Sequence, residues 1–182
     1  MINKSIHETP NTMTDFDPRY PVGAFDPADS TALSELIDQI AALPGRLLEL
    51  ASDLDEGKLE TPYREGGWTA RQVIHHLADS HLNAYTRFRL ALTEERPTIK
   101  PYDEKLWAEL PDARRGPVQP SLALLEGLHA RWVLLLGSMT PGDLQKVFVH
   151  PQRGEMTLER TLRLYAWHCR HHVGHLEIVK GL

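Results

Sequence analysis

Residues 157–179, TLERTLRLYAWHCRHHVGHLEIV, form the clearest helical pattern in this chain. Steps of three and four residues, the spacing of one helix face, connect a stripe made of Leu158, Thr161, Tyr165, His168, His172, His175 and Val179. Leu162, Val173 and Leu176 flank this stripe, so its histidines lie beside core residues and not on a solvated face. The pattern predicts a final helix whose histidines face the interior.

Histidine is concentrated in two windows of the sequence. Seven of the ten histidines lie there, namely His75, His76 and His81 in one apolar stretch and His168, His171, His172 and His175 in the last helix. Neutral histidine is the commonest protein ligand of zinc-like metals, and it is only a mediocre helix former. A metal ion held between two helices is therefore the first functional hypothesis.

The spacing alone leaves the ligand set open. His168 with His172, and equally His171 with His175, have the i,i+4 spacing that lets two imidazoles converge on one ion. The alternative for such a pair is two solvent-facing side chains. For His76 the alternative is a core histidine that is satisfied by ordinary hydrogen bonds.

Two familiar metal motifs are excluded. The zincin pattern H-E-x-x-H needs glutamate after the first histidine, whereas Cys169 follows His168. Ferritin-like di-iron bundles need two E-x-x-H motifs, and the single match, Glu126 with His129, is attributed to chance. A mononuclear site is favoured. Cys169 lies about 100° round the helix from His168, and it is predicted to be a small buried apolar residue.

Apolar residues at helical spacing predict three further helices, over about Ser30–Leu54, Thr69–Leu92 and Pro120–Ser138. Pro44 is expected to kink or divide the first of these helices. Thr69 and Gln72 have the spacing of a capping box at the start of the second.

A long connection separates the second and third predicted helices. Residues 93–118 carry Pro97, Pro101, Pro111 and Pro117, which predicts a crossover, and long connections of this kind are often functional. A short helical turn begins at Thr140, and no segment has the length and alternation of a β-strand. The sequence predicts an all-α four-helix bundle with one long crossover between helices 2 and 3, a class that places metal sites on facing helices.

Length and composition indicate one cytoplasmic domain. Of the 182 residues, 1–19 are predicted to form a flexible N-terminal tail and 20–182 the single bundle domain, with Met13 as an alternative translation start. The net charge of −5 gives no case for nucleic acid as a partner. The sequence lacks a membrane-length apolar run and the apolar core of a signal peptide, and its lone cysteine fits a reducing compartment.

Several motifs, in order along the chain, resemble those of one known family. They are YPVGAFDP (20–27), TPYREGGWTARQVIHHLADSH (61–81), KPYDEKLW (100–107), SLALLEGLHARW (121–132) and LYAWHCRHHVGH (164–175). Together they resemble the DinB/YfiT-like metalloenzymes, most closely the YfiT branch, whose members are described as metal-dependent hydrolases. The resemblance covers about residues 20–182.

The resemblance implies a four-helix bundle, commonly a homodimer, with one divalent metal per subunit, most often zinc and otherwise nickel. Carried over position by position, it implies three ligands: His76, the second histidine of HHLAD, with His168 and His172 of W-H-x-x-x-H. It therefore favours His168 and His172 over His171 and His175. Cys169 and Arg170 depart from the family pattern, but no ligand position is substituted.

Three neutral imidazoles would leave the charge of a divalent ion unneutralised and coordination positions open, as in catalytic sites. We therefore predict a metal-dependent hydrolase that uses a metal-activated water on a small-molecule substrate. The family also resembles thiol transferases. One alternative is therefore the transfer of a low-molecular-weight, bacillithiol-like thiol to an electrophile, and a second is a non-catalytic metal-binding protein.

Other side chains are expected to surround the metal. The candidates are Asp79, Asn83 and Arg87 on the helix of His76, and Glu177 on the last helix. Asn83 and Arg87 lie on the same side as His76 and could orient an anionic substrate group; a polar surface stripe is the alternative. The pocket wall is predicted to include Tyr102 and Asp103 from the crossover, and the indoles are assigned to core or pocket wall: Trp68, Trp107, Trp132 and Trp167.

Overall fold

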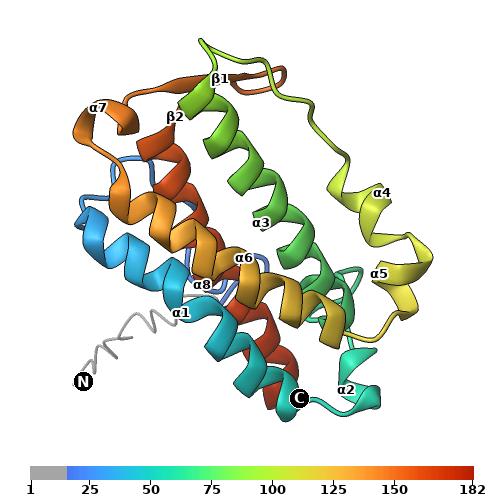
Figure 1. Ribbon diagram of the computed structural model, residues 1–182. Coiled ribbons are helices and arrows are strands. Elements are labelled where there is room, and N and C mark those ends of the chain that lie inside the picture. Colours follow the sequence, from blue (N-terminus) through green and yellow to red (C-terminus); the bar gives the residue numbers. More distant parts are fainter. Residues whose placement is uncertain (1–15) are drawn as a thin grey trace, which may run out of the picture.

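The computed structural model describes residues 16–182, which form a bundle of four long helices with a small β-hairpin at one end (Figure 1). The long helices are α1 (Leu33–Ser52), α3 (Ala70–Thr93), α6 (Gln119–Ser138) and α8 (Leu158–Gly181). Both α1 and α3 pack against α6 and α8, so α1 and α3 occupy opposite corners of the bundle. The predicted four-helix bundle is confirmed. No helix among the described residues is long and apolar enough to cross a membrane.

The direction of the helices explains the long crossover. α1 and α8 run one way along the bundle and α3 and α6 the other way, so the neighbours α3 and α6 are parallel (Figure 1). The chain must therefore return along the bundle between them. It does so through two short helices, α4 (Glu104–Ala108) and α5 (Pro111–Arg115), which pack along α3.

Local sequence signals account for the first two long helices. In α1 the buried side chains recur at steps of three and four: Leu36, Ile40, Leu43, Leu47 and Leu50. At the start of α3 the Thr69 hydroxyl accepts from the Gln72 N–H, and the Gln72 amide oxygen accepts from the Thr69 N–H. The predicted capping box is confirmed.

Pro44 lies within α1 and does not divide it, so that part of the prediction is wrong. A proline inside a helix leaves the carbonyl four residues earlier without its usual N–H donor. Here that carbonyl belongs to Ile40, and Nδ1 of His129 on α6 lies 2.7 Å from its oxygen. A side chain from the neighbouring helix therefore replaces the donor that Pro44 lacks.

The expectation that the chain contains no strand is also wrong. β1 (Val147–His150) and β2 (Gly154–Thr157) form an antiparallel hairpin in which Val147 faces Thr157 and His150 faces Gly154. The hairpin also holds the crossover, because the Ile99 N–H donates to the Val149 carbonyl at 3.0 Å. Strands of four residues are too short for alternation to be recognised, and pairing stabilises them here.

Two very short helices complete the fold. α2 (Glu56–Leu59) lies between α1 and α3, and α7 (Pro141–Leu144) forms the helical turn predicted from Thr140. Of the predicted tail, residues 1–15, with Met13, lie outside the described residues. The chain just after it packs on α8 at Gly174, where an added Cβ would lie only 2.8 Å from Cγ of Pro21.

Candidate metal centre

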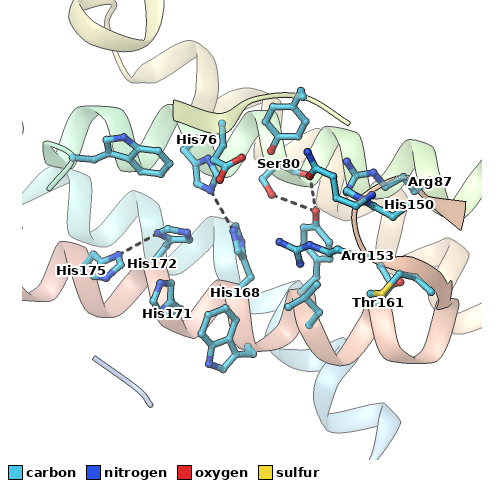
Figure 2. A pocket seen from close by; sticks show the side chains of 18 of the residues that line it. His76, Ser80, Arg87, His150, Arg153, Thr161, His168, His171, His172 and His175 are labelled. Carbon is cyan, nitrogen blue, oxygen red and sulfur yellow. Dashed lines mark hydrogen bonds between the residues drawn. The ribbon is translucent and has the colours of Figure 1, made fainter. Parts of the chain in front are cut away.

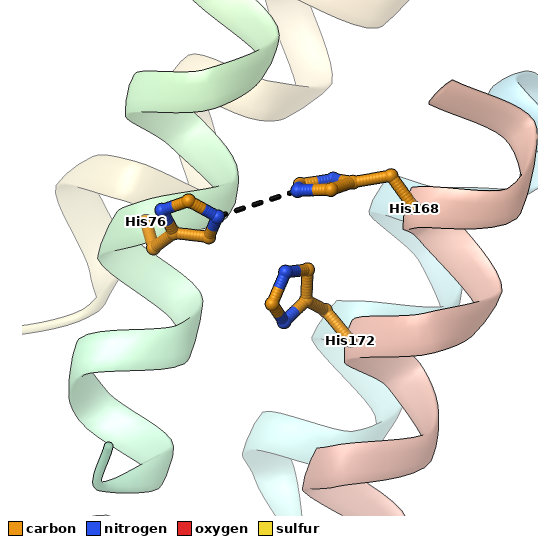
Figure 3. Close-up of side chains that lie close together, drawn as sticks. All are labelled: His76, His168 and His172. Atoms are coloured by element: carbon orange, nitrogen blue, oxygen red, sulfur yellow. Dashed lines mark hydrogen bonds between the residues drawn. The ribbon is translucent and has the colours of Figure 1, made fainter. Parts of the chain in front are cut away.

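Three histidines from two facing helices direct ring nitrogens toward one point (Figure 3). His76 comes from α3, and His168 and His172 come from successive turns of α8. One nitrogen of each ring lies within 4.8 Å of the other two, and the Nε2 atoms of His76 and His168 are 3.3 Å apart. The structure thus brings together the three residues that the family resemblance implies.

The chemistry of these side chains fits a divalent metal. Burial lowers the pKa of His76 to about 4, with smaller effects of His171 and His175. Burial is also the main reason why the pKa values of His168 and His172 lie well below the usual value. The rings are therefore neutral at pH 7, which is the form that binds metals. Two nitrogens that share a tetrahedral zinc ion at about 2.0–2.1 Å are expected roughly 3.3 Å apart, as these two Nε2 atoms are.

The competing pair, His171 and His175, lies beside this cluster. Their ring nitrogens form a second close group with His172, and Nδ1 of His175 is 3.2 Å from Nδ1 of His172. Both rings also pack on aromatic neighbours: His175 stacks on Tyr63 at 3.8 Å and His171 on Trp167 at 4.4 Å, measured between ring centroids. Because His172 uses Nδ1 toward His175, its Nε2 is the nitrogen left for an ion.

His168 also uses its second ring nitrogen. Its Nδ1 lies 3.1 Å from Nε2 of His81, and Nδ1 of His81 lies 2.9 Å from Nε2 of His129. His129 is the histidine that bonds the Ile40 carbonyl, whereas Glu126 of the same E-x-x-H match is exposed. The match is therefore not a metal-binding pair.

A cavity of about 350 Å³ opens in front of the three histidines (Figure 2). In this view the histidine cluster lies at one side, Arg87 and His150 lie at the other, and Arg153 reaches between them. The floor between the two sides is formed by hydroxyl groups, with Oγ of Ser80 3.3 Å from the Tyr165 hydroxyl oxygen. The cavity is large enough for a small molecule that spans both sides.

The side of the cavity away from the histidines is positively charged. Arg87 comes from α3 and Arg153 from the turn of the hairpin, and within residues 16–182 neither guanidinium has a hydrogen-bond or ion-pair partner. After burial, the two arginines are the causes that lower the pKa of His150, and both oppose the burial that raises the pKa of Tyr165. Glu104 is the one carboxylate among the described residues that line the cavity.

The other candidate residues are placed differently. Asn83 donates to the Asp79 carbonyl at 2.8 Å, and neither residue lines the cavity. Glu177 is exposed and accepts from Arg46 at 2.6 Å. Tyr102 does line the cavity, and burial raises its pKa to about 12, whereas Asp103 caps α4 by accepting from two backbone N–H groups.

Cys169 is buried, as predicted, and burial raises the pKa of its thiol. It is therefore neither a ligand nor a reactive thiolate. Three of the four indoles lie where they were predicted: Trp132 is fully buried in the core, and Trp68 and Trp167 line the cavity. For Trp107 the prediction is wrong, because it packs on Tyr102 outside the cavity with 37% of its surface exposed.

Four residues around the site were not assigned a role from sequence. His150 and Arg153 lie on a hairpin that has no periodic signal, so nothing in the sequence connects them with the helices. His81 and His129 lie on helices, but their contacts depend on how three helices pack together. The signal in the sequence that could have found them is that His81 and His129 both lie on apolar faces of predicted helices.

The fold and the site define a four-helix bundle with a buried histidine cluster suited to one divalent metal. The chain belongs to the DinB superfamily, whose family model matches residues 39–176. A relative from Bacillus mycoides, named "Putative metal-dependent hydrolase", is 53% identical over 164 residues, which cover 88% of this chain and 94% of the relative. A Bacillus cereus protein of the same name is 53% identical with the same coverage.

Solved structures agree with this family assignment. YfiT from Bacillus subtilis, described as "a probable metal-dependent hydrolase with an unusual four-helix bundle topology", matches with a TM-score of 0.85 and 44% identity. The match covers 89% of this chain and 95% of YfiT. The four-helix bundle protein TT2238 matches with a TM-score of 0.56 and 25% identity, over 80% of this chain and 98% of that one.

Proposed function

We propose that this protein is a metal-dependent hydrolase in which His76, His168 and His172 hold one divalent ion. The observation that carries the proposal is the convergence of three neutral imidazoles, from two facing helices, on the wall of a cavity. The names of the relatives point the same way. Three neutral ligands fit a catalytic site better than a closed structural one.

A bound divalent ion supplies an electrophile that acidifies water toward a pKa of about 7 and polarises a substrate oxygen. The surrounding residues bind and orient the substrate. The Tyr165 hydroxyl donates to the Ser80 carbonyl at 3.2 Å and is protonated at neutral pH, because burial raises its pKa. The indoles of Trp68 and Trp167 line the cavity beside the histidines.

The charge of the cavity points to an anionic substrate. The described residues that line the cavity include two arginines, Arg87 and Arg153, and one carboxylate, Glu104, so the wall carries an excess of positive charge before any ion is added. Guanidinium groups bind carboxylates and phosphates through paired N–H donors. We therefore propose a small substrate that places its reacting bond at the histidines and a carboxylate or phosphate at the arginines.

Metal analysis tests the ligand set. We expect about one divalent ion per chain in the purified protein, zinc or nickel, and loss of that ion in His76→Ala, His168→Ala and His172→Ala. His75→Ala is the matched control, because His75 lies on the same helix but bonds Ser121 at 2.8 Å, away from the cluster. Full metal occupancy in all three ligand variants would overturn the assignment.

A substrate panel tests the reaction. The metal-loaded protein is offered esters and amides that carry a carboxylate or phosphate, and then an electrophile with different low-molecular-weight thiols. Turnover of the first set supports the hydrolase. Turnover only in the presence of a thiol would instead support thiol transfer. The reacting thiol would then be the added low-molecular-weight thiol, because Cys169 is buried. Silence in both panels favours a metal-binding protein without catalysis.

The arginines have a test of their own. Arg87→Gln and Arg153→Gln should each raise KM for an anionic substrate roughly 10- to 100-fold, since a hydrogen bond to a charged group contributes about 1.5–3 kcal/mol. KM for a neutral analogue and the metal content should stay unchanged. Equal effects on charged and neutral substrates would contradict a role in charge recognition.

A further inference from the structure

A row of three histidines, two of them buried, connects the candidate metal centre with the opposite corner of the bundle. The histidine row consists of His168, His81 and His129, which come from α8, α3 and α6 in turn. His81 and His129 are 0% and 1% exposed, so water does not compete for their ring nitrogens. Each contact in the row is at hydrogen-bond distance, 3.1 Å between His168 and His81 and 2.9 Å between His81 and His129.

The far end of the histidine row has a defined hydrogen-bond direction. His129 Nδ1 lies 2.7 Å from the Ile40 carbonyl oxygen, and a carbonyl oxygen only accepts. Nδ1 of His129 must therefore carry a hydrogen. The carbonyl is free to accept it because Pro44, four residues later in α1, has no N–H to donate.

The direction of this hydrogen bond determines the donor and the acceptor in every other contact of the histidine row. A neutral imidazole has one N–H and one lone pair, so His129, with its hydrogen on Nδ1, accepts through Nε2. His81 must then donate through Nδ1 and accept through Nε2. His168 must in turn donate through Nδ1, which leaves the lone pair on Nε2, the atom 3.3 Å from Nε2 of His76.

We propose that His129 and His81 are positioning residues, which hold His168 as the Nδ1–H tautomer so that its Nε2 lone pair faces the metal centre. The inference rests on the proposed function only for the use of that lone pair. Outer hydrogen bonds of this kind orient metal-binding histidines, and their loss typically weakens metal binding about 10- to 100-fold.

The group on which the histidine row ends, the Ile40 carbonyl, carries no net charge. Histidine ligands are often oriented by a carboxylate, which adds negative charge to the site. The histidine row ends on the neutral Ile40 carbonyl and contains no carboxylate, so it orients His168 without neutralising the ion. An ion held this way keeps its full charge for the substrate.

The metal-free protein tests the tautomers directly. Long-range proton–nitrogen NMR correlations distinguish the two neutral forms of each imidazole. We expect His129, His81 and His168 all to carry hydrogen on Nδ1 in the wild-type protein. A hydrogen on Nε2 of His168 would overturn the inference, whatever the variants do and whether or not the protein binds metal.

Two substitutions at His129 then distinguish its role in setting the hydrogen-bond direction from its role in packing the core. His129→Gln keeps a donor for the Ile40 carbonyl and an acceptor for His81, whereas His129→Leu keeps only bulk. We expect zinc affinity, measured by competition with a chelator, to stay within about threefold for Gln and to fall about 10- to 100-fold for Leu. His168 should keep one tautomer in the Gln variant and show both in the Leu variant.

The outcomes are distinguishable. If His129→Leu does not fold, the wild-type tautomers and the Gln variant still decide the matter. Unchanged zinc affinity and a single His168 tautomer in a folded Leu variant would overturn the inference. A wild-type protein that binds no metal but shows the expected tautomers would instead contradict the proposed function and leave the histidine row in place.

Discussion

Asp79 illustrates how a single half-buried side chain makes stability depend on pH. It lies three residues after His76 on α3, and burial, with a smaller effect of Asp112, raises the pKa of its carboxyl group to about 6. The ordinary pKa of aspartate is about 3.9. The folded protein therefore holds this proton more tightly than the unfolded chain, so the ionised form is destabilising above pH 6.

We predict that Asp79→Asn stabilises the protein at about pH 8 by on the order of 1 kcal/mol, a value that allows for the partial exposure of the side chain. The gain should be fully present above pH 6 and shrink as the pH falls toward 4, because wild-type Asp79 then protonates. Urea unfolding at the two ends of this range measures it. Asp38→Asn, at an exposed position of α1, is the control; a gain that does not change with pH would contradict the prediction.

Single residues also show what sequence can predict about the site. His168 and His172 are one helical turn apart, so their shared direction follows from the geometry of α8 alone. Choosing His76 as the third candidate ligand required the family motif, because spacing within one helix cannot show which two helices face each other. Arg153 belongs to a short hairpin, and its place in the cavity depends on pairing between the hairpin and the crossover. Neither the packing of two helices against each other nor the pairing of the hairpin with the crossover leaves a periodic signal in the sequence.

At the scale of elements, the start of α3 is the local structure most closely connected with the site. The capping box of Thr69 and Gln72 satisfies backbone N–H groups that otherwise lack partners at a helix start. His76 lies two turns beyond Thr69 on the same helix. The cap therefore fixes the end of α3 from which His76, the first proposed ligand, projects.

We predict that Thr69→Ala lowers the free energy of unfolding by about 1 kcal/mol, the usual effect of losing such a cap. Thr86→Ala is the matched control, because Thr86 is exposed in the middle of the same helix and its hydroxyl only donates to the Leu82 carbonyl. Replacing it should be neutral or slightly stabilising, since alanine favours helices. Equal losses in both variants, measured by denaturant unfolding, would show that the cap has no special role.

The elements were predicted in proportion to their length. The four long helices have enough turns for their apolar spacing to stand out, and the prolines of residues 93–118 mark the crossover. The two strands of the hairpin and the helices α2, α4 and α5 are each four or five residues long, which is too short for a period to be recognised. The predicted division of the first helix at Pro44 is wrong for another reason: the effect of Pro44 on α1 depends on His129 of a different helix.

At the scale of the whole molecule, the unusual feature is how much neutral histidine the interior holds. All nine histidines among residues 16–182 have pKa values below the ordinary one, and burial is the largest cause for each. Most of them lie at the candidate metal centre or beside it, as proposed ligands, as neighbours of those ligands or in the histidine row. We therefore expect an interior with so many neutral histidines to make the fold sensitive to acid.

We predict that the metal-free protein unfolds on mild acidification. Below about pH 6.5 the unfolded imidazoles take up protons, whereas His76, His171 and His175 do so in the folded protein only near pH 4. The unfolded state then binds more protons, so stability falls as pH drops from 6.5 to 4, by about 1.4 kcal/mol per pH unit for each extra proton. Three such protons give a slope of roughly 4 kcal/mol per pH unit, comparable with the whole stability of about 5–15 kcal/mol.

Far-UV circular dichroism during acid titration, with and without zinc, measures the effect. The metal-free transition should lie near pH 5, within the window of the histidines and above the carboxylates. Asp79 opposes it with a single proton, which is too little to cancel the effect of the histidines. Zinc should move the transition to lower pH, because protons and metal compete for the same ring nitrogens. A metal-free protein that stays folded below about pH 4 would show that the buried histidines contribute little to the pH dependence of its stability.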